Sequence, residues 1–245
     1  MNKVIGVFSA KGGVGKTTCA LNIAMALHDL GSDIMLIDCD LKNSNLALHL
    51  GLYDFPLTLQ DVLEGDVNFL EAVYVHSSGL RIVPASLTLR EFKTEIHKLK
   101  TALDSMDHHV VLDTPPGSSE EVSSIIQLCN EILLITTPNI PSLTDSMKTI
   151  QMVKDVGKKI RGIIINRAER KYELNVEDIE KICGLPVLAV IPEDKNIKKS
   201  LHTSTPVVRH KPYSPASIAI KKLSASIIER EYSPPRFYRI RRLFK

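Results

Sequence analysis

A glycine-rich segment, Ala10-Lys11-Gly12-Gly13-Val14-Gly15-Lys16-Thr17-Thr18, lies between the apolar run Val4–Phe8 and an expected helix over residues 17–30. Glycines let backbone N–H groups turn inward around phosphate oxygens, and a helix starting there points its positive end at them. Lys16 is expected to neutralise the β- and γ-phosphates of ATP or ADP, and the Thr17 hydroxyl to ligate Mg²⁺. A plain glycine-rich turn is the alternative, but Gly-Lys-Thr-Thr between a strand and a helix favours a phosphate loop.

Short apolar runs recur along the chain, each followed by a loop and an amphipathic stretch. The expected strands are Val4–Phe8, Ile34–Ile37, Leu80–Val83, Val110–Leu112, Ile132–Ile135, Ile160–Ile165 and Val187–Ile191. The expected helices are residues 17–30, 88–104, 119–129, 143–155, 174–183 and 215–230. Apolar runs without polar alternation suit strands covered on both faces. The pattern predicts a three-layer α/β fold, with a mostly parallel twisted sheet and helices on both faces.

Composition narrows the class of protein and of site. The chain has 245 residues and is 44% hydrophobic, enough for one domain over residues 1–230. The four cysteines stand far apart, which argues against a disulfide framework or a cysteine metal site. Expected strand residues begin at Lys3, and no apolar run approaches the ~20 residues of a membrane-spanning helix. A cytoplasmic protein is therefore expected, with any membrane contact peripheral.

Carboxylates follow two of the expected strands. Asp38 and Asp40 come after Ile34–Ile37, and Asp113 follows Val110–Leu112 before a sharp turn at Thr114-Pro115-Pro116-Gly117. Ligand sites in parallel sheets lie at this carboxyl edge, where carboxylates can hold Mg²⁺ through water and orient an attacking water. A single aspartate after a strand is more often a cap or turn former. Together with the phosphate loop, these aspartates predict a nucleotide site.

The glycine-rich segment departs from the general phosphate-loop motif, because Ala10 stands where a glycine is usual and Lys11 follows it. In this the sequence resembles the MinD and ParA-type ATPases, whose deviant Walker A signature is K-G-G-x-G-K-T. The resemblance implies that Lys11 reaches phosphates bound by a second copy in an ATP-dependent homodimer. It also implies that Asp40 positions water and contacts the magnesium shell, that Asp113 has the Walker B role, and that the Gly117 N–H senses the γ-phosphate.

The resemblance extends from Met1 to about Ser226. The stretches Asn45–Leu52, Leu59–Gly65 and Leu80–Ala85 read like archaeal MinD segments. It implies adenine contacts at two further strand ends, with an asparagine bonding the base and the next loop packing beside it. The matching residues are Asn166, Arg167, Pro192 and Asp194. Such residues alone are usually turn formers. Ser118 and Ser119 stand where many relatives have an apolar residue, which leaves the identity of the partner open. Asp145 stands where the resemblance implies an acidic partner-binding helix, and a solvated helix start is the alternative.

The last ten residues are basic and amphipathic. Residues 231–235 read as a linker that Pro234 and Pro235 set apart, and residues 236–245 as a helix. Its apolar residues share one face, and they are Phe237, Ile240, Leu243 and Phe244. Five basic residues flank them, so the net charge of +3 less these five leaves −2 for the rest. This pattern favours a helix lying in an anionic membrane surface; packing on the body or contact with nucleic acid are the alternatives.

The leading hypothesis is a MinD-like ATPase switch that hydrolyses ATP slowly, is stimulated by an unidentified protein partner, and positions cell-division or other polar machinery. A ParA-like partitioning ATPase that binds DNA nonspecifically is the main rival, although the slightly acidic body does not favour DNA. An iron–sulfur scaffold would need paired cysteines. A small-molecule phosphotransferase would need an acceptor pocket, which the sequence alone does not reveal.

Overall fold

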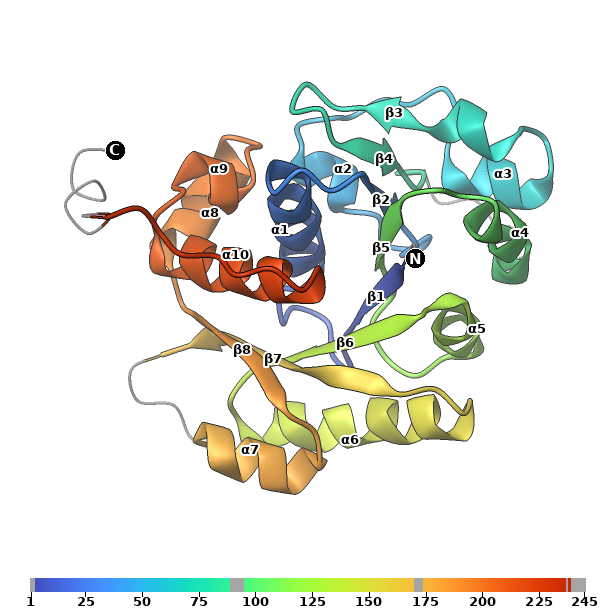
Figure 1. Ribbon diagram of the computed structural model, residues 1–245. Helices are drawn as coiled ribbons and strands as arrows, with labels where there is room; N and C mark the ends of the chain where they lie inside the picture. The colour runs from blue at the N-terminus through green and yellow to red at the C-terminus, as the bar shows by residue number, and fades with distance from the viewer. Residues whose placement is uncertain (1–2, 89–94, 170–173, 237, 239–245) are drawn as a thin grey trace.

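Eight strands form one twisted sheet in the computed structural model, which describes residues 3–88, 95–169, 174–236 and 238 (Figure 1). The strands are β1 (Val4–Phe8), β2 (Ile34–Asp38), β3 (Tyr74–Val75), β4 (Arg81–Val83), β5 (His109–Asp113), β6 (Glu131–Thr136), β7 (Ile160–Ala168) and β8 (Val187–Pro192). Their order is β3-β4-β2-β5-β1-β6-β7-β8. All neighbouring pairs are parallel except β3 with β4.

Helices cover both faces of the sheet. They are α1 (Lys16–Asp29), α2 (Leu46–His49), α3 (Leu59–Glu64), η1 (Phe69–Ala72), η2 (Ile96–Lys98), α4 (Leu99–Asp104), α5 (Glu120–Leu128), α6 (Ile140–Asp155), α7 (Val176–Cys183), α8 (Lys195–His202), α9 (Val207–His210) and α10 (Pro215–Ile227). One apolar core packs α1, α2, α9 and α10 against one face of the sheet. A second core packs the helices from α3 through α7 against the other face. Burial on both faces explains the continuous apolar runs, and the predicted three-layer fold is confirmed.

Strand register brings the two acidic sites together. β1 lies between β5 and β6, so the loop after β1 opens at the centre of the sheet's carboxyl edge. On the neighbouring strands, Asp38 pairs in register with Asp113, and the Cys39 N–H donates to the Asp113 carbonyl at 2.7 Å. The phosphate loop and both aspartates therefore meet at one edge, as ligand sites in such sheets do.

Some elements differ from the sequence prediction. Of the helix expected over residues 88–104, residues 96–104 are helical, divided between η2 and α4, whereas residues 88 and 95 lie outside these helices. The remainder of that expectation, residues 89–94, lies outside the described residues. The antiparallel edge strand β3 was not predicted, nor were α2, α3, α8 and α9. β3, α2, α3 and α9 have only two to six residues each, and α8 carries only two apolar residues, Ile197 and Leu201, so their apolar periodicity is weak.

The chain after α10 is described only as far as residues 236 and 238. Residues 231–235, the predicted linker, have no regular secondary structure. The predicted membrane residues Phe237, Ile240, Leu243 and Phe244 lie outside the described residues. Within the described part of the chain, no helix combines the length and apolar character needed to cross a bilayer.

Candidate functional site

The loop after β1 turns through two glycines with left-handed backbone. Gly13 has φ 79° and Gly15 has φ 93°, and α1 begins directly afterwards at Lys16. A Cβ on Gly15 would lie 2.4 Å from the Asn166 side-chain nitrogen. That nitrogen donates to the Val14 carbonyl at 2.7 Å and so braces the loop from β7. Only glycine combines this backbone conformation with so close a neighbour.

Lys16 and Asp113 form a buried ion pair. The Lys16 Nζ lies 2.6 Å from the Asp113 Oδ1, and the two side chains are only 7% and 1% exposed. Burial alone would lower the pKa of Lys16, but the Asp113 carboxylate outweighs it and the pKa is raised. Lys16 is therefore a fixed cation at the start of a helix. The second Asp113 oxygen is buried and accepts no hydrogen bond from the described residues.

Asp38 and Asp40 differ in what they face. Asp38 is fully buried and accepts from the Asp40 N–H at 3.0 Å and the Ser44 hydroxyl at 2.8 Å. Asp40 lines the cavity beside the phosphate loop and accepts from the Asn43 N–H at 3.2 Å. Burial raises the pKa of both carboxyl groups, and the nearby Asp113 adds to it. Asp38 shapes the turn, whereas Asp40 is placed to contact a ligand.

A cavity of about 470 Å³ opens over the phosphate loop. It brings together residues of the loop, the turn after β2, α2, the turn after β5, β7 and α8. They are Ser9, Lys11, Gly12, Gly13, Gly15, Lys16, Thr17, Thr18, Asp40, Asn43, Asn45, His49, Pro116, Arg167 and Leu201. Its size suits a nucleotide, because ligand cavities in proteins usually run to a few hundred Å³. Most of the predicted phosphate-loop residues line it.

The donors at this cavity fit a magnesium ion that takes most of its ligands from phosphate and water. Thr17 and Asp40 line the cavity. Asp113 has a buried oxygen without a partner among the described residues. No group of three or more His, Cys, Asp or Glu side chains among those residues has the arrangement of an all-protein metal site. Mg²⁺ in phosphate sites characteristically uses one or two carboxylates beside substrate phosphates, so the residues present suit it.

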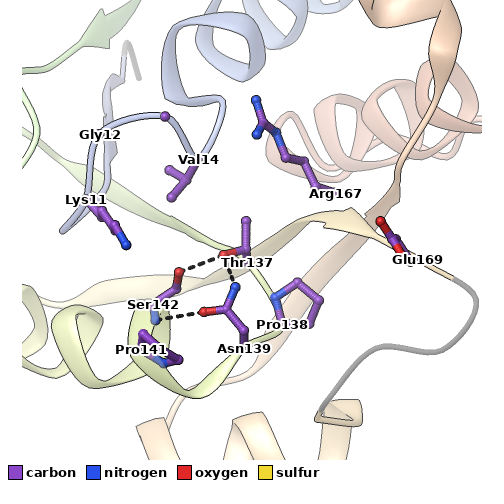
Figure 2. Close-up of a pocket in the computed structure, with 11 residues that line it drawn as sticks. Lys11, Gly12, Val14, Thr137, Pro138, Asn139, Pro141, Ser142, Arg167 and Glu169 are labelled. Carbon is purple, nitrogen blue, oxygen red and sulfur yellow. Dashed lines mark hydrogen bonds between the residues drawn. The ribbon is translucent and has the colours of Figure 1, made fainter.

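A second cavity, of about 480 Å³, adjoins the phosphate loop on the side of β6 and α6 (Figure 2). Thr137, Asn139 and Ser142 form its polar wall. The Asn139 amide donates to the Thr137 hydroxyl at 2.9 Å and accepts from the Ser142 N–H at 3.0 Å. Lys11 and Arg167 line both cavities. The exposed Lys11 ammonium makes no hydrogen bond or ion pair with the described residues.

The predicted base contacts fall into two groups. Arg167 in β7 lines both cavities and has a left-handed backbone with φ 55°, a strained conformation common at functional sites. Asn166 lines neither cavity, and its side chain contacts the phosphate loop through the Val14 carbonyl. Pro192 ends β8, and neither it nor Asp194 is among the residues lining either cavity. The Asp194 carboxylate caps α8 instead, accepting from the Asn196 N–H at 2.9 Å, and it accepts from the Ala216 N–H at 3.3 Å.

Sequence reasoning missed His49 and Leu201 at the nucleotide cavity. His49 ends α2, and its buried Nδ1 has no hydrogen-bond partner among the described residues. Burial lowers the pKa of this imidazole. Both residues come from short helices that the sequence pattern does not reveal, so neither could have been placed at the site. The only signal was that His49 follows the acidic turn closely.

Comparisons with known proteins agree with this site. Residues 1–228 match a ParA family model described as the NUBPL iron-transfer P-loop NTPase. An uncharacterised ATP-binding protein of Methanocaldococcus jannaschii is 34% identical over 233 residues, 93% of this chain and 88% of the relative. The septum site-determining protein MinD of Thermotoga maritima is 33% identical over 221 residues, 84% and 81% of the two chains.

Solved structures also show similarity to MinD. The septum site-determining protein MinD complexed with Mg-ADP from Pyrococcus horikoshii superimposes with a TM-score of 0.87 at 32% identity. The match covers 94% of this chain and 97% of that one. The predicted resemblance is therefore confirmed. With a phosphate loop, a buried lysine–aspartate pair and this likeness over nearly its whole length, the chain belongs to the ParA family of P-loop NTPases, among the MinD/ParA-type ATPases.

Proposed function

We propose that this chain is a MinD-like switch that hydrolyses ATP, forms a homodimer when ATP is bound, associates peripherally with the cytoplasmic face of a membrane, and positions cell-division or other polar machinery. The observation that carries the proposal is the buried Lys16–Asp113 pair beside Asp40, with Lys11 at the same cavity and without an ion pair among the described residues. The fixed Lys16 cation binds the nucleotide phosphates, Asp40 takes part in hydrolysis, and Lys11 contacts the phosphates bound by a second copy of the chain.

Hydrolysis in this site needs charge and position more than covalent chemistry. Lys16 supplies a preorganised positive charge for the terminal phosphates, and the loop N–H groups add to it. Asp40 orients the attacking water at the cavity wall. Thr17 and Asp113 would hold Mg²⁺, which neutralises the charge that develops on the phosphates. Burial raises the pKa of the Asp40 carboxyl, so this group is a better proton acceptor than an exposed aspartate.

Gly117 links the second acidic turn to the phosphate loop. Its N–H donates to the Ser9 carbonyl at 3.0 Å, with φ at 96°. A γ-phosphate near this turn would compete with Ser9 for the N–H, so the turn would differ between the ATP and ADP states. In a switch of this kind, differential contact with the γ-phosphate is what biases the two states.

The exposed Lys11 supports the dimer. Among the described residues Lys11 has no acidic partner in an ion pair, and phosphates bound by a second copy would neutralise its charge. The family resemblance assigns this lysine the same role across a dimer interface. Dimerisation through ATP would also pair the two tails, and two weak anchors on one particle bind a surface far more firmly than one.

The tail supports the membrane assignment through its sequence. Burying each large apolar side chain contributes about 1.5–3 kcal/mol, and each basic residue about 1 kcal/mol beside anionic lipid. Ordering the backbone costs about 1–2 kcal/mol per residue, so a single tail binds marginally. Membrane residence would then follow the ATP-dependent dimer. An iron–sulfur role is not proposed, because all four cysteines are buried and free, and the described residues contain no group of three or more His, Cys, Asp or Glu side chains arranged to hold a metal.

Cosedimentation with anionic liposomes, in ATP and in ADP, tests the membrane part. Full-length protein is expected to pellet in ATP only, and deletion of residues 236–245 is expected to abolish pelleting while ATP binding persists. Ile240→Glu should do nearly the same, because it places a charge in the apolar face. A ParA-like DNA binder would instead pellet with DNA, lose binding steeply with salt, and tolerate Ile240→Glu. Wild-type-like liposome binding by Ile240→Glu, or none by either protein, contradicts the membrane proposal.

A further inference from the structure

The helix α8 carries a basic stripe on its exposed side. Lys195, Lys198, Lys199 and His202 follow the spacing i, i+3, i+4, i+7, which places them on one helix face. All are exposed, and none has a side-chain hydrogen bond or ion pair with the described residues. The opposite side packs on the core through Ile197, and Leu201 faces the nucleotide cavity.

Acidic residues are sparse around this stripe in the sequence, where the exposed Glu193 and the buried Asp194 directly precede Lys195. From Lys195 to Ile228 the chain contains no aspartate or glutamate. The stripe is therefore not a solvated face of alternating charges, which is the usual arrangement on a surface helix. Within this span Arg209 is neutralised by Asp29, with Nη2 to Oδ1 at 2.6 Å, whereas the α8 stripe has no such partner among the described residues.

One buried carboxylate ties the start of α8 to the start of α10. Asp194 caps α8 through the Asn196 N–H and accepts from the Ala216 N–H at the beginning of α10. The last turn of α8 contacts α9 through Thr203 and His210, whose side chains lie 3.2 Å apart. The helix that carries the basic stripe is therefore fixed at its start by Asp194 and at its end by the contact with α9.

The chain after α10 returns to this corner of the molecule. At the far end of α10, the Arg230 side chain donates to the Leu30 carbonyl at 2.8 Å. Tyr232 then lies with its ring 6.0 Å from the Lys221 ammonium, which itself donates to the Pro212 carbonyl just before α10. Figure 1 shows the red segment running back along α10 toward the side of α8 and α9. The described chain therefore ends toward the side of the molecule that carries α8 and α9.

We propose that the exposed face of α8, formed by Lys195, Lys198, Lys199 and His202, is a second contact with an anionic lipid surface, used together with the tail. This inference rests on the proposed membrane association, which it extends from the tail to the body. Lipid is favoured over nucleic acid because the amphipathic tail starts from the same corner. A body contact orients the dimer on the membrane, and headgroup phosphates supply the charge that the stripe lacks.

The test compares two triple variants of the full-length protein in ATP. Lys195→Gln, Lys198→Gln, Lys199→Gln removes the stripe, and Lys100→Gln, Lys154→Gln, Lys159→Gln removes the same charge from exposed lysines elsewhere. Binding is measured on vesicles of phosphatidylglycerol and phosphatidylcholine, and on phosphatidylcholine alone. The stripe variant is expected to bind the anionic vesicles roughly a hundredfold more weakly, since each of the three lysines contributes about fivefold. The control variant should stay within about twofold, and ATP hydrolysis should be unchanged in both.

The outcomes separate this inference from the proposal beneath it. If the stripe variant binds anionic vesicles like wild type, the α8 contact is wrong while the tail can still anchor the protein. Failure of wild type to bind vesicles refutes both. Loss of binding to duplex DNA with retained vesicle binding would assign the stripe to nucleic acid and overturn the lipid contact. An equal loss in the control variant would mean that net charge, not the stripe, controls binding.

Discussion

The Lys16 ammonium is held by the Asp113 carboxylate, 2.6 Å away. At the residue scale this pair links folding to function, because each group is buried and each compensates the other. A cation that is already desolvated and oriented needs little rearrangement to meet phosphate oxygens. The same arrangement means that a substitution of Lys16 changes both ligand affinity and stability.

Lys16→Ala is expected to abolish measurable ATP binding by calorimetry. It should also lower the free energy of unfolding by about 3–5 kcal/mol, because Asp113 is left buried without its partner. The double variant Lys16→Ala, Asp113→Asn removes that uncompensated charge. It should recover much of the melting temperature without recovering ATP binding. Near-normal ATP affinity in either variant would refute the phosphate-loop assignment.

Asp40→Ala should separate binding from hydrolysis. Asp40 lies on the cavity wall and not in the ion pair, so its removal should leave ATP affinity near that of wild type. Phosphate release should fall by roughly 10² or more, since water positioning and proton transfer are lost. Asp61→Ala, an aspartate at the capping box of α3, serves as a control away from the cavity. Normal turnover by Asp40→Ala would remove its proposed role.

At the element scale, the sequence predicts the long helices and the buried strands with clear apolar patterns, and it misses the short helices. Buried parallel strands gave unbroken apolar runs, so all seven expected strands formed within one or a few residues of their predicted ends. The short helices α2 and α8 bring His49 and Leu201 to the cavity, and tertiary packing rather than local pattern specifies them. The Asn166 side chain was predicted at the site, but its bond to the Val14 carbonyl depends on two segments that meet only in the fold.

Asp194→Ala is expected to loosen α8 rather than to affect the adenine site directly. Burial would raise the pKa of Asp194, but hydrogen bonds from Asn196, Ser214 and Ala216 outweigh it and the pKa is lowered. Its stabilisation is therefore present above the unfolded-state pKa of 3.8 and is lost as pH falls through the lower folded value. The loss of the cap should cost about 1–2 kcal/mol at pH 7.

Thermal unfolding over a pH series measures this effect. The difference in melting temperature between wild type and Asp194→Ala should be largest at neutral pH and shrink below pH 3.8. Asp194→Asn, which keeps an accepting oxygen, should lose much less. A pH-independent difference would show that packing, and not the ionised cap, stabilises α8 and the basic stripe that it carries.

At the scale of the whole molecule, the sheet places the candidate functional residues on one edge. The phosphate loop, both acidic turns and Lys11 surround one cavity, and a second cavity adjoins it between the loop and α6. The sequence could predict that these residues meet at the carboxyl edge, because parallel topology requires it. It could not predict that Lys11 would line both cavities without an ion pair among the described residues, because this depends on the backbone path through Gly12 and Gly13.

Lys11 leads to a prediction about assembly. Lys11→Ala should bind ATP nearly as well as wild type, because Lys16 supplies the charge within its own subunit, but it should fail to dimerise. The measurement is sedimentation velocity with ATP in an Asp40→Ala background, which slows hydrolysis and should hold the parent protein as a dimer. The matched control is Lys42→Ala in the same background; Lys42 lies in the turn after β2 and pairs with Glu121 at 3.5 Å. A persistent dimer in Lys11→Ala, Asp40→Ala would count against the role across the interface. If the Asp40→Ala parent itself stayed monomeric with ATP bound, the ATP-dependent dimer, and with it the coupling of nucleotide to paired tails, would be wrong.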